Sequence, residues 1–142
     1  MKDSMVNYNY EDLKDHFAVA GVIKNEKGEI LMMDHVKFDF WTLPVGKVKD
    51  NETVEEGLMN ELFEELGIKV IEYKVLNSFD KVYLRRGNIV KVICYIMDIL
   101  VYENEIYNKE PEKHRSLKWM SVEEISDLER ISDPTREYLK LI

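Results

Sequence analysis

The sequence predicts a single α/β (α+β) domain in which a twisted, mixed sheet carries helices on both faces. A chain of 142 residues has the length of one domain with one hydrophobic core. Segments with strand-like composition alternate along it with segments that have the capping residues of helices. Because no repeat, low-complexity tract or linker divides the chain, residues 1–142 are expected to fold as one unit.

Three strands are predicted in the first third of the chain. Residues 17–23 are apolar, residues 25–28 have the composition of a turn, and residues 29–33 resume the strand pattern, which together predict a hairpin. Residues 40–43 form a third, short β-prone run. Pro44 should end it, since proline has no backbone N–H to donate to a neighbouring strand.

The clearest predicted helix spans residues 53–66. Thr53 and Glu56 have the spacing of a capping box, and Gly67 can end the helix in a left-handed conformation. Apolar residues recur at every fourth position of this segment, namely Val54, Leu58, Leu62 and Leu66. Such a stripe packs one side of a helix against a sheet.

The second half of the chain predicts two long strands, a short strand and two helices. Residues 68–79 and 89–102 are rich in β-branched and aromatic residues, and the second run is apolar enough to be a central strand buried on both faces. Residues 116–120 form the short strand. A capped helix is expected over residues 121–128, and Pro134 lies near the start of a last helix at the C-terminus.

The charge of the chain limits its partners. Its formal net charge is −8, so stable binding to nucleic acid, which needs a basic face, is disfavoured. The polar residues 1–15 resemble neither a secretory signal nor a membrane anchor and are expected to form a flexible or peripheral segment. The lone Cys94 lies in an apolar run and is expected to pack in the core. These features predict a cytoplasmic protein with no stable nucleic-acid partner and no membrane partner.

A group of glutamates in the predicted helix indicates chemistry. Glu61, Glu64 and Glu65 are three and four positions apart, so their carboxylates are expected on one helix face, where they repel one another. Mg²⁺ would relieve that repulsion, because it combines a few carboxylates with water and phosphate oxygens. Gly46, in the loop before the helix, allows the backbone to approach the same ion and its phosphates. The alternative is an acidic helix face that meets only solvent.

The spacing of these residues resembles the Nudix box. From Gly46 the chain continues with Glu52 after five residues, and residues 60–68 read Asn-Glu-Leu-Phe-Glu-Glu-Leu-Gly-Ile. The family pattern is Gly-x5-Glu-x7-Arg-Glu-U-x-Glu-Glu-x-Gly-U, where U is a bulky aliphatic residue, and every fixed position matches except Asn60. Similar residues also flank the box, at positions 41–44 and 117–124.

This resemblance implies a Nudix-type α/β/α sandwich with the box as a loop-helix-loop. It also implies Mg²⁺-dependent hydrolysis of a nucleoside diphosphate linked to another group. The favoured substrate is a nucleoside or deoxynucleoside triphosphate, as in the MutT-like pyrophosphohydrolases, and Mn²⁺ could replace Mg²⁺. By position in the box, the metal ligands would be Glu61, Glu64, Glu65 and the backbone carbonyl of Val45. The alternative for Glu61 or Glu64 is to serve instead as the general base that takes a proton from water, while Glu52 would brace the loop and the helix.

Two residues depart from the family pattern. Asn60 replaces an arginine that orients a neighbouring catalytic glutamate, so about 1–3 kcal/mol of orienting interaction and part of the turnover should be lost. Val45 stands where many relatives have glycine, but its main-chain carbonyl can still be a ligand. Since neither change removes a carboxylate, the metal site is expected to be intact. The predicted catalytic residues are Glu52, Asn60, Glu61 and Glu64.

Residues outside the box supply further candidates. Residues 108–114 resemble a MutT-like segment whose acidic residue reaches the metal, which favours Glu110 and then Glu112, with a solvated loop as the alternative. Tyr83 lies near a position where relatives that cleave dinucleoside polyphosphates have tyrosine, although a half-buried strand residue is the simpler account. The predicted substrate contacts are Gly46, Lys47, Tyr83 and Arg85.

Several other side chains have two interpretations. Arg85 and Arg86, beside Gly87, either contact phosphate or form the solvated tip of a hairpin. Three aromatic residues either stack on a base or pack in the core, namely Phe38, Phe40 and Trp41. No ligand spacing is visible at the histidines His16, His35 and His114.

Two functions compete with triphosphate hydrolysis. One is hydrolysis of a dinucleoside polyphosphate. The other is a Nudix-fold nucleotide sensor with weakened catalysis, for which Asn60 is the sole support. A chain released from catalysis has no need of a self-repelling acidic cluster, so an enzyme is preferred. The oligomeric state is left open, with a homodimer as one state to test.

Overall fold

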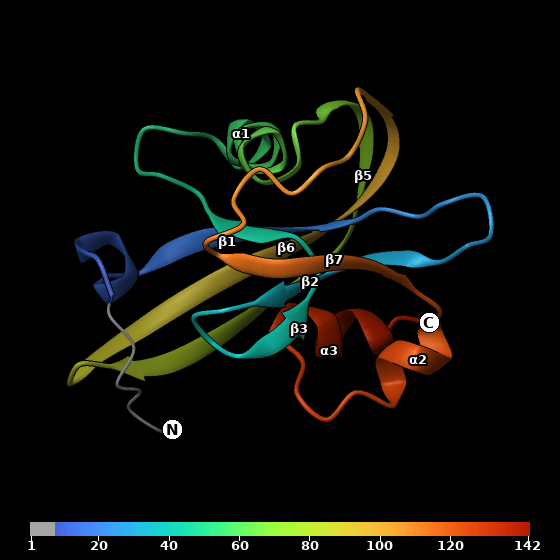
Figure 1. Ribbon diagram of the computed structural model, residues 1–142. Coiled ribbons are helices and arrows are strands. Elements are labelled where there is room, and N and C mark those ends of the chain that lie inside the picture. Colours follow the sequence, from blue (N-terminus) through green and yellow to red (C-terminus); the bar gives the residue numbers. More distant parts are fainter. Residues whose placement is uncertain (1–7) are drawn as a thin grey trace.

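The computed structural model describes residues 8–142 and confirms the α/β/α fold class, with the strands divided between two sheets. A four-stranded mixed sheet has the order β4-β1-β6-β5, and a three-stranded antiparallel sheet has the order β3-β2-β7. In chain order the elements are η1 Tyr10–Leu13, β1 His16–Val22, β2 Ile30–His35, β3 Phe40–Thr42, β4 Val45–Lys47, α1 Val54–Leu66, β5 Lys69–Arg85, β6 Asn88–Glu103, β7 His114–Met120, α2 Val122–Ser126 and α3 Asp133–Leu139. Figure 1 shows α1 on one side of the strands and α2 with α3 on the other.

The predicted hairpin of the first two strands forms only at its turn, where Lys24 and Ile30 make an antiparallel bridge, and the predicted pairing of the strands is wrong because β1 and β2 lie in different sheets. Both edges of β1 are paired, antiparallel with β4 and parallel with β6, which leaves no edge for β2. The chain turns at Asn25, whose N–H donates to the Glu29 carbonyl at 3.0 Å. It then crosses to the other sheet past an isolated bridge between Lys24 and Ile30.

Helix α1 begins and ends where its local sequence predicts. The Thr53 side chain accepts a hydrogen bond from the Glu56 N–H, and the Glu56 carboxylate accepts one from the Thr53 N–H. Gly67 ends the helix with a φ of 74°, a left-handed conformation that favours glycine. The predicted apolar stripe is buried at Leu58, Leu62 and Leu66.

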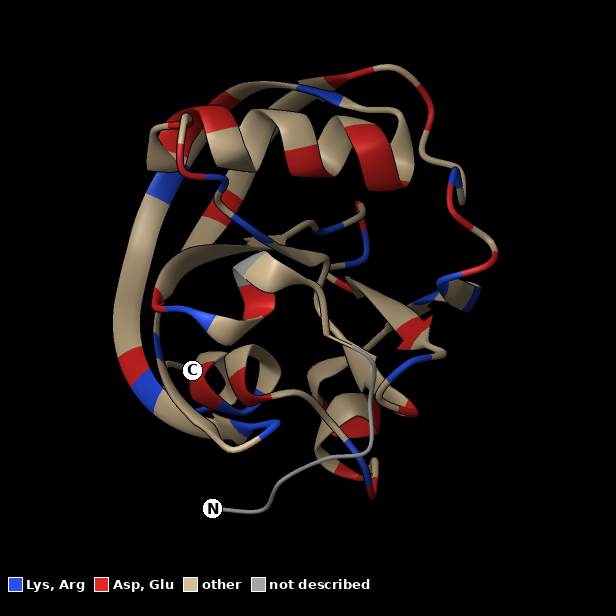
Figure 2. Cartoon of the chain, turned by 90° about the vertical axis from the view of Figure 1, so that its left-hand side faces the viewer, with Lys and Arg blue, Asp and Glu red and all other residues tan. Residues whose placement is uncertain are grey.

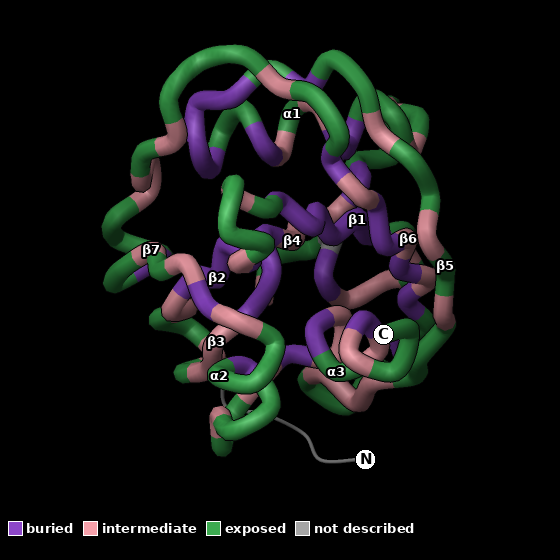
Figure 3. The backbone as a smooth tube through the Cα atoms, turned by 90° about the vertical axis from the view of Figure 1, so that its right-hand side faces the viewer, coloured by how far each residue is buried: buried purple, intermediate pink, exposed green. Residues whose placement is uncertain are grey.

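Two hydrophobic cores lie on opposite sides of the strands. One joins apolar residues of β1, β2 and β6 to Ile125 of α2 and Tyr138 of α3. The other joins alternate residues of the same strands, such as Val19 and Leu31, to the buried face of α1. Figure 3 shows the buried stretches of β1 and β2 between these two helical layers. One strand serves both cores because successive side chains point to opposite faces.

The strands β5 and β6 form a longer hairpin than predicted. The run expected to end at residue 79 continues to Arg85, and the turn consists of Arg86 and Gly87 with φ of 51° and 77°. β6 is central in the pairing, between β1 and β5, but the expectation of burial on both faces is wrong, since Ile89 is 71% exposed. This end of the hairpin projects past the helices (Figure 1).

The last two helices start at their predicted caps. Ser121 and Glu124 form a capping box at α2, which ends at Ser126 and not at residue 128. Pro134 lies in the first turn of α3, where the Ser132 side chain caps the helix. Both starts depend on side chains within three residues of the helix end, which explains why local sequence predicts them.

The N-terminal segment departs in part from its expected peripheral position. Residues 1–7 lie outside the described chain, which begins at Tyr8. Tyr10 is 77% exposed, as a peripheral residue would be. Asp12, in the same short helix, is 8% exposed and pairs with Lys47 of β4.

Candidate active site

Helix α1 divides its glutamates between the interior and the surface. Glu65 is 5% exposed, and Glu61, one turn earlier, lines the same cavity. Glu64 lies at the rim, where its side chain is 47% exposed and 3.8 Å from Lys49 Nζ. Of the three glutamates, Glu61 and Glu65 therefore face the cavity together. Glu64 does not, because it is turned about 100° from Glu65 around the helix. Figure 2 shows the acidic residues as red bands along α1.

Gly46 allows β4 to approach α1 closely. A Cβ atom at this position would lie 2.1 Å from the Glu61 side chain, which is far inside van der Waals contact. Any other residue here would push Glu61 out of its position. Glycine at position 46 is therefore required for Glu61 to keep this position.

The carbonyl of Val45 lies on the outer edge of the sheet. Pro44 O and Val48 N both hydrogen-bond to β1. Bonds to one neighbour alternate along an antiparallel strand, so Gly46 also faces β1 while Val45 O points away from it. Since β4 is the edge strand of its sheet, this oxygen is not used by a neighbouring strand.

Two residues near the start of β7 complete the acidic end of the cavity. Glu65, Glu110 and His114 each offer a ligand atom, and these atoms lie within 4.8 Å of one another. His114 Nε2 lies 3.4 Å from Glu65 Oε2, and His114 is 1% exposed. Glu112, the second choice for this loop, is exposed. His114 was not predicted as a site residue, and its one local signal in the sequence is its place four residues after Glu110.

Negative charge at this end exceeds the charge of its protein partners. Burial, followed by the negative charges of the neighbouring glutamates, raises the pKa of Glu61 to about 8. Burial and then Glu110 also raise the pKa of Glu65. Glu65 Oε1 and His114 Nδ1 are buried without a hydrogen-bond partner within residues 8–142. Crowded carboxylates beside unpartnered acceptor atoms fit a divalent cation, which would supply both charge and bonds.

Glu52 and Asn60 connect the loop to the helix. The Asn60 side-chain amide donates to Glu52 Oε2, while Glu52 Oε1 accepts from the Lys49 N–H at 2.9 Å. The Glu52 carboxylate thus links the backbone of the loop to a side chain of the helix. Asn60 is exposed and uses one neutral hydrogen bond where arginine would supply a charged pair.

A cavity of about 550 Å³ opens beside the acidic cluster, a size suited to a small ligand. The four predicted substrate contacts Gly46, Lys47, Tyr83 and Arg85 all line it. Phe38 and Phe40 line it as well, with ring centroids 5.4 Å apart in a stacked arrangement, whereas Trp41 packs against the core. Of the two arginines near the hairpin turn, Arg85 faces the cavity.

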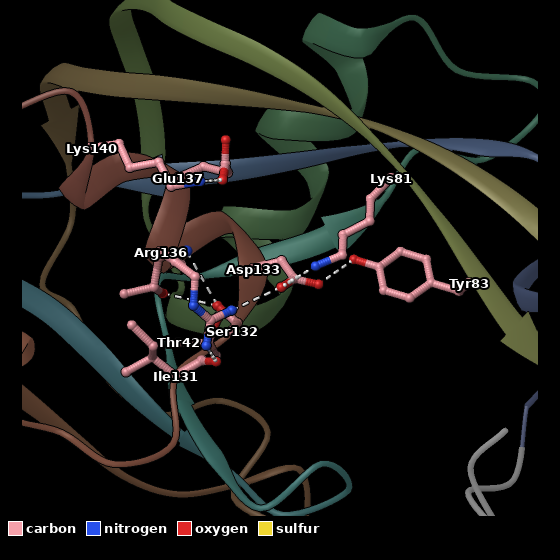
Figure 4. Close-up of polar contacts among 10 residues, drawn as sticks. Thr42, Lys81, Tyr83, Ile131, Ser132, Asp133, Arg136, Glu137 and Lys140 are labelled. Carbon is pink, nitrogen blue, oxygen red and sulfur yellow. Dashed lines mark hydrogen bonds and ion pairs between the residues drawn. The ribbon is translucent and has the colours of Figure 1, made fainter. Parts of the chain in front are cut away.

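A second carboxylate, Asp133, lies at the opposite end of the cavity and is matched by protein partners. Tyr83 Oη donates to Asp133 Oδ2 at 2.7 Å. Lys81 Nζ and Arg136 Nη1 each donate to Asp133 Oδ1 at 2.9 Å (Figure 4). Burial opposes ionisation of Asp133, but these partners outweigh it and lower its pKa.

Cys94 also lines the cavity. It is 2% exposed, which confirms the expected burial. Burial raises its pKa to about 12, so the thiol is neutral and packs as a small apolar group.

An α/β/α sandwich whose loop-helix-loop presents carboxylates to a nucleotide-sized cavity defines the Nudix class of hydrolase. The NUDIX domain family model matches residues 14–142, so the chain belongs to this family. It is accordingly an enzyme that hydrolyses pyrophosphate bonds in nucleotides.

Curated relatives agree with this assignment. The chain is 29% identical over 112 residues to an 8-oxo-dGTP diphosphatase from Buchnera aphidicola, a match that covers 78% of this chain and 79% of that protein. It is 38% identical over 58 residues to an RNA pyrophosphohydrolase from Pasteurella multocida. That second match covers 41% of this chain but only 29% of the relative.

Solved structures share the fold. A MutT Nudix hydrolase from Burkholderia pseudomallei superposes with a TM-score of 0.74 at 26% identity, covering 91% of this chain and 98% of that one. The MutT protein from Methanosarcina mazei has a TM-score of 0.75 at 25% identity, covering 89% and 91%.

Proposed function

We propose that the chain hydrolyses a nucleoside or deoxynucleoside triphosphate at a phosphoanhydride bond with Mg²⁺, for which Mn²⁺ can substitute. The observation that carries this proposal is the under-compensated cluster of Glu61, Glu65, Glu110 and His114 at one end of the cavity. Two relatives named 8-oxo-dGTP diphosphatase support a triphosphate substrate.

The oxygen atoms at this end of the cavity are suitable ligands for a divalent cation. The carboxylate and carbonyl oxygens that would hold it belong to Glu61, Glu65, Glu110 and Val45, with Glu64 reaching in from the rim. A divalent cation held by these residues would supply Lewis-acid polarisation of the phosphoryl group and activation of a water molecule. Glu65 Oε1, buried without a partner among the described residues, is the acceptor that supports this fit most directly.

Side chains of the protein supply the general base and hold the loop in place. Of the two glutamates that could act as the general base instead of as a metal ligand, Glu61 is favoured over Glu64 because it lines the cavity. Glu52 and Asn60 hold the loop that carries Gly46 against the helix. Since Asn60 supplies a neutral bond, we expect slower turnover than an arginine would support.

The rest of the cavity accommodates the nucleotide. Phe38 and Phe40 offer aromatic faces on which a base can stack. Lys47 and Arg85 supply positive charge for phosphate oxygens. The Tyr83 hydroxyl is already bonded to Asp133, so we assign it to shaping the cavity rather than to binding a second nucleotide.

The proposal is tested by measuring phosphate and pyrophosphate release with Mg²⁺ or Mn²⁺. The panel contains nucleoside triphosphates, 8-oxo-dGTP, dinucleoside polyphosphates, nucleotide sugars and ADP-ribose, and wild type is compared with Glu65→Gln, which removes a carboxylate of the acidic cluster. A matched control is Glu72→Gln, which removes an exposed glutamate on β5. Metal-dependent turnover of triphosphates that collapses only in Glu65→Gln supports the proposal. Nucleotide binding without turnover would support the sensor alternative instead.

We further propose that the protein acts in the cytoplasm on free nucleotides, without a stable nucleic-acid or membrane partner. A buried, neutral Cys94 suits a reducing compartment, and the negative net charge disfavours a nucleic-acid backbone. Within residues 8–142, no helix combines the length and apolarity that crossing a membrane requires. Sedimentation at several protein concentrations tests whether it forms a homodimer.

A further inference from the structure

Three cationic side chains gather around Asp12 at the mouth of the cavity. Lys47 Nζ lies 2.9 Å from Asp12 Oδ1, and Lys37 Nζ lies 3.8 Å from Asp12 Oδ2. Arg85 Nη1 donates to the backbone carbonyl of Asp12 at 2.9 Å. The three cations come from β4, the loop after β2 and the end of β5, so they are brought together by the fold.

Within residues 8–142, no carboxylate other than Asp12 is paired with Lys37, Lys47 or Arg85. Burial lowers the pKa of Lys37, and Lys47 and Arg85 lower it further, against the opposite effect of Asp12. Burial likewise lowers the pKa of the adjacent His16, with Arg85 and Lys47 acting in the same direction. Burial is the larger cause of both shifts, and the contributions of Arg85 and Lys47 add the effect of a positive potential among the described residues that line the cavity.

Asp12 is carried by a segment outside the matched family domain. The domain match begins at residue 14, whereas η1 spans Tyr10–Leu13. Asn9 and Asp12 cap this short helix reciprocally, and the Lys14 ammonium pairs with Asp50. Because η1 belongs to neither sheet, the Asp12 carboxylate can move away from the cavity without unfolding a strand.

We propose that Lys37, Lys47 and Arg85 form an anion subsite for the substrate's phosphate chain, which the Asp12 carboxylate fills until phosphate displaces it. Polyphosphate carries more charge and more acceptor oxygens than a carboxylate, and guanidinium binds phosphate in a two-pronged arrangement, so polyphosphate outcompetes Asp12. The inference deepens, and rests on, the proposed nucleotide hydrolysis. It makes Asp12 a built-in competitor that raises the KM.

The test measures binding of inorganic tripolyphosphate by calorimetry in EDTA at low ionic strength, where the acidic cluster holds no divalent metal. Asp12→Asn should tighten binding roughly three- to tenfold, since it removes the competing charge while keeping an oxygen that can accept from the Asn9 N–H. Lys37→Gln should weaken binding by a similar factor. Asp15→Asn is the matched control, because Asp15 bonds to the Lys91 N–H and not to the three cations.

Unchanged or weaker binding in Asp12→Asn would overturn the proposal and make Asp12 a residue that positions Lys47. Binding that Lys37→Gln does not affect would overturn it as well. Circular dichroism and thermal unfolding establish that each variant is folded.

The kinetic counterpart is a split between KM and kcat. With Mg²⁺, Asp12→Asn should lower the KM for a nucleoside triphosphate three- to tenfold with little change in kcat. Tripolyphosphate binding in EDTA does not require turnover, so the two proposals fail separately. Absence of hydrolysis with the expected binding pattern would reject the proposed substrate and retain the subsite. Hydrolysis without the expected binding pattern would retain the proposed substrate and reject the subsite.

Discussion

The pKa values of partly or fully buried carboxylates shift in opposite directions at the two ends of the cavity. At one end, burial and like charge raise the pKa values of Glu61 and Glu65. At the other, Lys81, Tyr83 and Arg136 lower the pKa of Asp133 despite its burial. The difference shows that burial alone does not set the protonation state, because the partners supplied by neighbouring elements decide its direction.

This contrast separates a site completed by the protein from one that requires a ligand. Asp133 is satisfied by side chains from β5 and α3, so it contributes to stability as built. Glu65 retains an unpartnered oxygen within the described chain. Functional sites commonly retain such uncompensated charge, whereas structural ion pairs remove it.

The largest effect is expected from Glu65→Gln. The amide preserves size but removes a negative charge from the cluster, so metal-dependent turnover should fall roughly 100- to 1,000-fold. Steady-state kinetics over a range of Mg²⁺ concentrations measure the loss. Full activity in this variant would show that the acidic end does not hold the catalytic metal. Glu72→Gln should behave as wild type.

Stability of the metal-free protein should depend on pH through Glu61. Its folded-state pKa of about 8 lies above the ordinary value of 4.5, so the folded state binds more protons than the unfolded state between these values. This contribution is fully present below about pH 4.5 and is lost as pH rises through about 8. We expect Tm in EDTA to fall roughly 5–10 °C from pH 5 to pH 8.

Glu61→Gln provides the comparison for that measurement. It should flatten the pH dependence of Tm over this range, and added Mg²⁺ should raise the Tm of wild type at pH 8. Equal slopes in wild type and variant would contradict the raised pKa of Glu61.

Asp133→Asn should lower the free energy of unfolding at every pH above about 5, where wild-type Asp133 is ionised. Its three partners would lose a charged acceptor, and because Lys81 and Arg136 are partly exposed the cost is about 1–2 kcal/mol. Urea unfolding measures the change, with Asp80→Asn as a control at an exposed carboxylate. A stabilised Asp133→Asn would remove the distinction between the two ends.

The smallest effect is expected at the contact between Glu52 and Asn60. Asn60→Arg replaces a neutral bond to Glu52 by a charged one and should raise kcat severalfold, up to about tenfold. Asn60→Gln, which keeps an amide, should give no such gain. A decrease in kcat for Asn60→Arg would mean that the asparagine is adapted to this loop.

Features that depend on near neighbours in the chain were predictable. Thr53 and Glu56 cap α1, and Gly67 ends it, because each signal acts within a few residues. The predicted hairpin of β1 and β2 failed for the opposite reason. Its alternative partners, β4 and β6, are far away in sequence, and competition among distant segments decides which edge is paired.

The sequence by itself determined the family, the helix α1 and the oxygen-rich character of its site, since a box of fixed spacing on a helix specifies all three. Only the tertiary structure decided that His114 reaches Glu65, that Asp133 is neutralised by β5 and α3, and that Asp12 meets three cations. Capping and helical spacing act over a few residues and are visible in order along the chain. The protonation, burial and pairing of a side chain depend on segments that come together only when the sheets and helices pack.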